Sequence, residues 1–165
     1  MVSRTRGIAM IYPPLSLVDN LTNFLKIELE KLNPNPIKQI ATLEIATQFP
    51  AMNIDIPDIT EVSIDTIPTN IIGFTYNLNI QIFEPLSITM KDRYSLLDTA
   101  LSKVFDIIIQ NPFLGLENKS GIQYINSEIN SITPKLFTTI LNKEQEIQYL
   151  GYNINLVIYI KEGTQ

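Results

Sequence analysis

The chain has 165 residues, of which 45% are hydrophobic and 18% are charged, and its formal net charge is −5. This length suits one domain spanning residues 1–165 and is too short for two. The acidic balance excludes a general nucleic-acid binder, and the absence of His and Cys excludes the usual general base, the thiol nucleophile and the soft metal ligands. No apolar run is long enough to cross a membrane.

Residues 1–14 are predicted to form a flexible arm. Arg4 and Arg6 precede a short apolar stretch, but Pro13 and Pro14 interrupt it too early for a signal peptide. We expect the two arginines to be solvated, and contact with an acidic partner surface is the alternative.

The next segment predicts a helix from Ser16 to Leu32. Ser16 is the expected N-cap, with Asp19 as its capping-box partner. Asn-Pro-Asn-Pro at residues 33–36 ends the helix, because proline lacks a backbone donor and pushes its predecessor out of the α region. The apolar stripe has helical spacing and consists of Val18, Leu21, Leu25, Leu29 and Leu32.

Residues 40–65 change to a period of two, which is typical of β-strands. Proline interrupts this stretch repeatedly and confines its strands to sheet edges or to a protruding ribbon. We therefore expect residues 54–68 to form a protruding β-ribbon. The predicted strands cover residues 40–49, 52–56 and 62–65, and the interrupting residues are Pro50, Pro57 and Pro68.

The clearest strand pattern runs from Ile72 to Ile82. Its alternation predicts one face buried in a core and the other turned to solvent or to a neighbouring subunit. The polar face holds Thr75, Asn77, Asn79 and Gln81, and the apolar face holds Ile72, Phe74, Tyr76, Leu78, Ile80 and Ile82.

A second helix is predicted to begin at Thr89, with Asp92 as its capping-box partner, and to end at Asn111 and Pro112. Its wide apolar face predicts packing against a sheet. The stripe consists of Met90, Tyr94, Leu97, Leu101, Val104, Phe105 and Ile108.

Strand patterns follow the second helix. Residues 122–132 and 136–141 predict two strands, and residues 142–146 predict a polar loop tip. The last strand runs from Leu150 to Ile160, with Asn153 and Asn155 on its polar face. The complete order predicts an α+β domain, with a mixed or antiparallel β-sheet packed on two α-helices.

Residues that could carry out chemistry are few. Four tyrosines on strands could stack bases, but their neighbours are Asn and Leu, so packing is the favoured role. The acidic residues of 55–65 lack the Gly and the spacing of a calcium loop and are expected to be solvated. Three further carboxylates have no suitable catalytic partner, so we predict no catalytic, cofactor or metal site. The four tyrosines are Tyr76, Tyr149, Tyr152 and Tyr159. The acidic residues of 55–65 are Asp55, Asp58, Glu61 and Asp65, and the three further carboxylates are Glu44, Glu84 and Asp92.

The order of elements resembles a known family. The chain resembles the tail terminator or tail-completion proteins of long-tailed bacteriophages in the order of four elements. These are a helix at 16–32, a strand ending in Ile-Gln-Ile-Phe at 80–83, a helix starting near Met90 and a last strand at 151–159. The resemblance covers residues 15–161 and rests on architecture and size, without a short sequence signature. It implies an α+β subunit of a hexameric ring that caps the tail tube and joins it to the head, with the ribbon laid on a neighbour.

The resemblance implies a structural virion protein and not an enzyme. Its partners would be further copies of itself, the tail tube protein and the neck or connector proteins, with DNA only as cargo passing a lumen. It would reside in the virion, and in the host cytoplasm during assembly, without a membrane partner.

An uncharged polar strand face suits a subunit interface, because burying amides costs less than burying charges. A closed ring would also cover exposed strand edges. Two alternatives stay open: a cap subunit of a contractile injection system, and a small-ligand-binding α+β domain in which the helix at 90–108 covers a cavity. The candidate interface residues are Ile56, Ile59, Ile64, Asn77, Asn79, Asn153 and Asn155.

Overall fold

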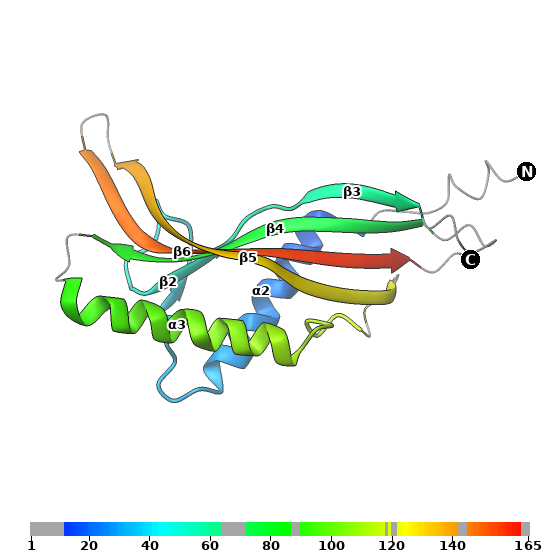
Figure 1. The fold of residues 1–165 in the computed structure, drawn as a ribbon, viewed down its shortest axis with the longest axis horizontal. Helices are drawn as coiled ribbons and strands as arrows, with labels where there is room; N and C mark the ends of the chain where they lie inside the picture. Colours follow the sequence, from blue (N-terminus) through cyan, green and yellow to red (C-terminus); the bar gives the residue numbers. More distant parts are fainter. Residues whose placement is uncertain are drawn as a thin grey trace, which may run out of the picture.

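The computed structural model describes residues 12–63, 72–86, 90–117, 119, 122–141 and 145–162. Within these residues, two helices lie against a six-stranded mixed sheet, which confirms the predicted α+β class (Figure 1). The elements in chain order are α2 (Pro14–Glu30), β1 (Gln39–Ile40), β2 (Ala51–Ile54), β3 (Asp58–Ser63), β4 (Ile72–Pro85), α3 (Met90–Gln110), β5 (Ile122–Leu141) and β6 (Gln145–Glu162).

The sheet is open and has a long antiparallel centre. β4, β6 and β5 lie side by side in antiparallel pairs, β2 pairs antiparallel with β4, and β1 adds a short parallel pair to β2. β3 pairs with the first half of β4, outside the main strand order. One margin of the sheet is therefore β5, and the other is shared by β1 and β3.

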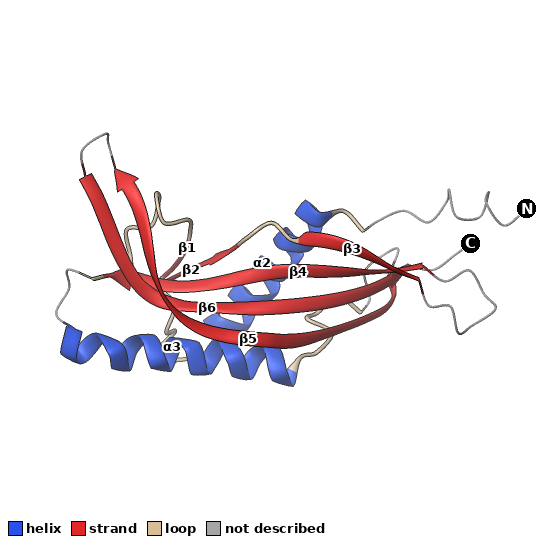
Figure 2. Ribbon diagram, turned by 45° about the horizontal axis from the view of Figure 1, so that its top comes forward, coloured by secondary structure: helices blue, strands red, loops and turns tan. Residues whose placement is uncertain are grey.

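Both helices pack on the same face of the sheet (Figure 2). The predicted alternation in β4 and β6 is confirmed, because the apolar side chains of both strands enter the main core between sheet and helices. The buried residues of these strands in that core are Phe74, Tyr76, Leu78, Ile80 and Ile82, and Ile154, Leu156, Ile158 and Ile160.

The start of the first helix differs from the prediction. α2 begins at Pro14, its N-cap is Pro13, and no side chain caps it. Proline suits the first helical turn because its fixed φ is helical and its missing N–H would have no partner there. Leu21, Leu25 and Leu29 of the predicted stripe are buried and Leu17 joins them, whereas Val18 and Leu32 are only partly buried.

The second helix, α3, ends at Gln110, and the N–H of Asn111 donates to Ile108 O at 3.2 Å. Leu97, Val104 and Ile108 of the predicted stripe are buried, and Ala100 and Ile107 beside it are buried too. Leu101 is only partly buried. Thr89 and the side chain of Asp92 lie outside the described residues, and with them the predicted cap.

The prediction of a strand over residues 40–49 is wrong. After β1 the backbone turns, with the N–H of Ala46 donating to Thr42 O at 2.9 Å. The side chain of Gln39 holds the far end of the turn, because its Oε1 accepts from the N–H groups of Thr47 and Gln48 at 2.7 and 3.0 Å. Leu43, Ala46 and Phe49 of this loop pack against a second, smaller core, whereas Ile45 is exposed.

The two strands predicted at 122–132 and 136–141 are one strand, β5, which pairs with β6 throughout. Pro134 does not break β5, because a strand at a sheet margin can lack one N–H donor. The predicted loop tip is also shorter, since β6 begins at Gln145.

The far end of the β5–β6 hairpin bends away from the rest of the sheet (Figures 1 and 2). The second core holds this end of the hairpin in its bent position and lies on the face of the sheet opposite to the helices. A Cβ added at Gly151 would overlap the carbonyl oxygen of Ile82, so glycine is required at this position, where β6 pairs with Phe83 of β4. The second core comprises Ala51, Phe83, Phe137 and Tyr149, with Leu43, Ala46, Phe49 and Ile147 packed around it.

Residues 58–63 of the expected ribbon at 54–68 lie in the sheet as β3. β3 pairs with β4 from Asp58 opposite Asn77 to Ser63 opposite Ile72. Ile64 and the remainder of the ribbon lie outside the described residues.

Candidate functional site

The four asparagines predicted at an interface come together on the helix-free face of the sheet. Asn79 on β4 lies opposite Asn155 on β6. The Nδ2 of Asn155 donates to Asn77 Oδ1 at 2.7 Å and to Asn79 Oδ1 at 3.1 Å. The Nδ2 of Asn153 donates to the same Asn79 oxygen at 3.0 Å. We call this group, with Asn130, the asparagine network.

Asn130 on β5 extends the network and was not predicted from the sequence. A register shift between Ile129 and Ser131 leaves Asn130 as the extra residue of a β-bulge. Its Nδ2 donates to Asn155 Oδ1 at 3.1 Å. The only sequence signal for this contact is the break in alternation at Glu128-Ile129-Asn130-Ser131-Ile132.

The asparagine network is a polar surface without charge. Asn77 and Asn130 are exposed, whereas Asn79, Asn153 and Asn155 are half-buried. Neutral amides can be covered by a partner at lower desolvation cost than carboxylates or ammonium groups. Their mutual hydrogen bonds also fix the side chains before any partner arrives, which lowers the entropy cost of binding.

Asp55 lies beside this face, just after β2. The Nδ2 of Asn53 donates to Asp55 Oδ1 at 3.2 Å. Burial raises the pKa of Asp55, while Lys135 and the hydrogen bond from Asn53 act in the opposite direction. No group of three or more acidic side chains in the described residues could hold a metal ion.

The apolar interface candidates have different surroundings. Ile56 is 68% exposed, between β2 and β3. Ile59 on β3 is partly buried against the main core. Ile56 is therefore the more available of the two for contact with a partner.

The four strand tyrosines do not form one stacking surface. Tyr76 is buried in the main core, and its hydroxyl donates to Tyr12 O at 2.6 Å. Tyr149 is buried in the second core and donates to Leu43 O at 3.3 Å. Tyr152 donates to Asp98 on α3, and Tyr159 lies against Gly73. Each has a packing contact of its own.

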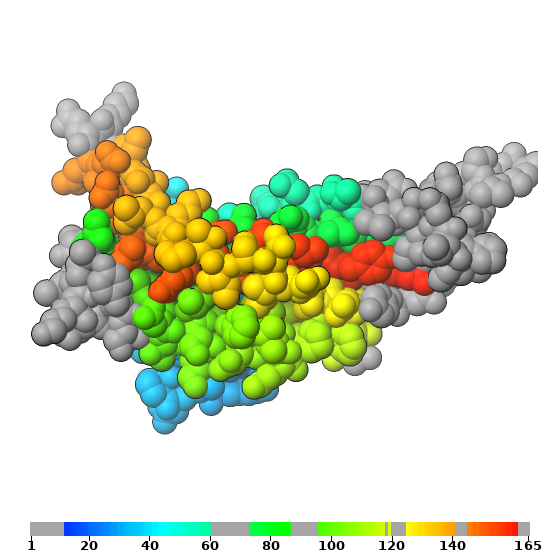
Figure 3. Space-filling view, in the orientation of Figure 1, coloured from blue at the N-terminus to red at the C-terminus, as the bar shows by residue number. Residues whose placement is uncertain are grey.

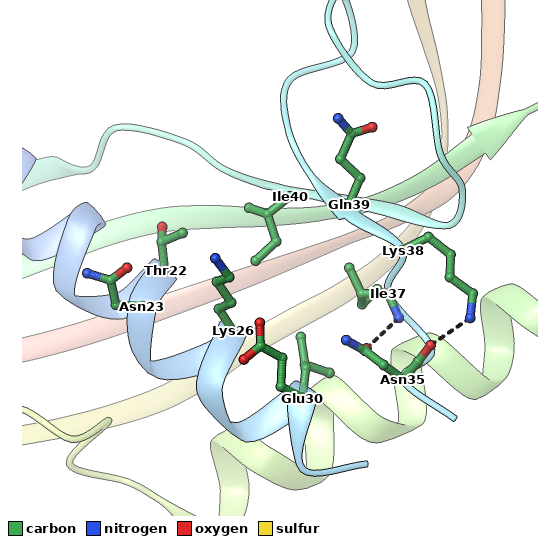
Figure 4. Close-up of a pocket in the computed structure, with 10 residues that line it drawn as sticks. Thr22, Asn23, Lys26, Glu30, Asn35, Ile37, Lys38, Gln39 and Ile40 are labelled. Carbon is green, nitrogen blue, oxygen red and sulfur yellow. Dashed lines mark hydrogen bonds between the residues drawn. The ribbon is translucent and has the colours of Figure 1, made fainter. Parts of the chain in front are cut away.

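A shallow groove of about 340 Å³ lies between the second half of α2 and residues 35–40 (Figure 4). Lys26 points toward Ile40, while Lys38 Nζ donates to Asn35 O at 3.0 Å. This groove is not the cavity under the second helix that a ligand-binding domain was expected to have. Its lining residues are Thr22, Asn23, Lys26, Leu29, Glu30, Asn35, Ile37, Lys38, Gln39 and Ile40.

No family model matches the chain, and no curated protein matches it. Neither of the described helices is long and apolar enough to span a membrane.

Proposed function

We propose that this chain is a tail terminator or tail-completion subunit of a long-tailed bacteriophage. Copies of it would form a hexameric ring that caps the tail tube and joins it to the neck and connector proteins. The proposal is supported by the element order, which resembles that of the family, and above all by the asparagine network.

The asparagine network has the properties of a surface that is exposed in the monomer and covered in an assembly. Four of its members lie on two adjacent central strands and the fifth on β5, so the sheet fixes their relative positions. Its amides can bond to polar groups of a neighbouring subunit. An open sheet also has two free margins, and closure into a ring would cover them.

A capping ring acts without catalysis. It stops tube growth by presenting one surface that matches the tube and another that does not. The net charge of −5 is compatible with a ring through which DNA slides, because acidic subunits do not attract phosphates.

Two measurements test this proposal. Negative-stain imaging of the purified protein should show six-fold rings. Complementation of a phage that lacks the protein should restore normal tail length and joined heads. A protein that stays monomeric at every concentration, or a functional loss on Glu84→Gln with the ring intact, would contradict the proposal.

A cap subunit of a contractile injection system would form the same kind of ring. Binding of the ring to a purified phage tail tube or to a purified injection tube distinguishes the phage function from the injection-system function. A small-ligand-binding domain is a second candidate, which the groove beside α2 favours. This alternative predicts a monomer whose melting temperature rises when ligand is added. In the Lys26→Met variant, the same ligand should no longer raise the melting temperature.

A further inference from the structure

The two margins of the sheet carry complementary exposed groups. On the far half of β5, three large apolar side chains are exposed: Ile132 by 38%, Leu136 by 56% and Ile140 by 70%. In the space-filling view, β5 runs along the outside of the molecule, and the hairpin projects at one end (Figure 3). At the opposite margin, Ile56 is 68% exposed, next to the start of β3.

The far half of β5 and the segment 55–63 carry charges of opposite sign, although Glu128 lies on the first half of β5. Between Ile129 and Ile140 the only charged residue is Lys135, whereas residues 55–63 contain three acidic residues and no basic one. Lys135 and Asp58 are both exposed. Within the part of the chain that the structure describes, the one salt bridge joins Lys31 to Glu28, so neither Lys135 nor Asp58 is in an ion pair there.

We infer that the part of β5 around Lys135 docks on the Asp55–Asp58 margin of a second copy of this chain. Lys135 faces Asp58 of the second copy, and the apolar side chains of β5 cover its Ile56. This inference rests on the proposed ring function and specifies which surfaces meet in the ring.

The contact joins two different surfaces of the same chain, and such a heterologous contact forms a ring when the rotation between copies closes and an open filament when it does not. A contact between two β5 margins would instead leave the acidic margin unpartnered and pair like surfaces. Two features of β5 disfavour a long ladder of backbone hydrogen bonds to a strand of another copy: Pro134 lacks an N–H, and the bulge at Asn130 disturbs the register. Docking through side chains is therefore favoured.

Inside one chain, Lys135 already acts on Asp55 through the electrostatic field, and its Nζ lies 5.4 Å from the ring centroid of Phe137. A purely intramolecular role for Lys135 is therefore the competing explanation. Charge reversal in separate chains distinguishes the two, because only a contact between copies can be restored by mixing.

The experiment uses full-length Lys135→Glu and Asp58→Lys variants, each shown to be folded by circular dichroism. Each variant alone should need about a tenfold or higher concentration for half-assembly, because like charges then meet at every contact. An equimolar mixture should regain wild-type assembly, since alternating copies pair opposite charges. Lys103→Glu and Asp106→Lys on the exposed side of α3 are matched controls, and sedimentation velocity is the readout.

Unchanged assembly of the single variants would overturn this contact while leaving the ring proposal intact. Loss of assembly without rescue on mixing would also overturn it, because the loss would then arise within one chain. A wild-type protein that never assembles would overturn the ring proposal and the contact together. Intact rings that fail to complement the phage would overturn the proposed function alone.

Discussion

Tyr152 on β6 donates its hydroxyl hydrogen bond to Asp98 on α3, and so joins the helix to the sheet. The hydrogen bond to Asp98 is the largest cause that raises the pKa of Tyr152, to about 12 from the ordinary value of 10.0. Burial and the negative charge of Asp98 act in the same direction.

The raised pKa predicts a pH dependence of stability. A folded-state pKa above the unfolded value means that the stabilisation is complete below pH 10 and is lost as the pH rises toward 12. Tyr152→Phe should therefore lower the free energy of unfolding by about 0.5 kcal/mol at pH 8, a small value because the site is largely exposed. Urea melts at pH 8 and pH 11 measure the difference. A difference that stays constant over this range would contradict the prediction.

The second prediction concerns the helix face. Leu97 is 1% exposed in the main core, whereas Leu101 is partly buried at its border. Leu97→Ala should cost about 2–5 kcal/mol, through lost burial and a residual cavity, and Leu101→Ala clearly less. Denaturant melts of the two variants test the ranking, and equal losses would mean that α3 is rotated from the described orientation.

How much of this fold the sequence predicts depends on how each element is buried. β4 and β6 alternate cleanly because one face meets the core and the other does not, so their periodicity reports their burial. The loop at 41–50 alternates without forming a strand, since Leu43 and Phe49 pack against the second core from a turning backbone while Ile45 is exposed. Periodicity alone cannot separate these two cases.

The site could be predicted only in part. Strand parity places Asn77 and Asn79 on one face, and Asn153 and Asn155 likewise on their own strand. It cannot give the register that sets Asn79 opposite Asn155, because register depends on pairing between distant segments. Asn130 was missed because a bulge changes the parity of β5. The same change of parity hides the continuity of β5, which was therefore predicted as two strands.

The third prediction concerns the second core, which holds the hairpin in its bent position. The Phe83 ring packs edge-on against the rings of Tyr149 and Phe137, with centroid distances of 5.5 and 6.2 Å. Phe83→Ala should accelerate amide hydrogen exchange by at least about tenfold in residues 135–150, because it removes the centre of this cluster. Exchange in α3 should change much less, since α3 packs on the main core. Equal acceleration in both regions would show that the two cores unfold as one unit.

The last prediction concerns the asparagine network. Asn79→Asp is nearly isosteric, and the new carboxylate can still accept the hydrogen bonds from Asn153 and Asn155, which Asn79 Oδ1 accepts at 3.0 and 3.1 Å. The free energy of unfolding of the monomer should therefore change by less than about 1 kcal/mol. Assembly should weaken about tenfold or more, because a partner would then cover a charge in place of an amide. Asn23→Asp on the exposed side of α2 is the matched control, and sedimentation velocity with urea melts gives both quantities. If Asn79→Asp assembled like the control, the asparagine network would not lie in a subunit interface.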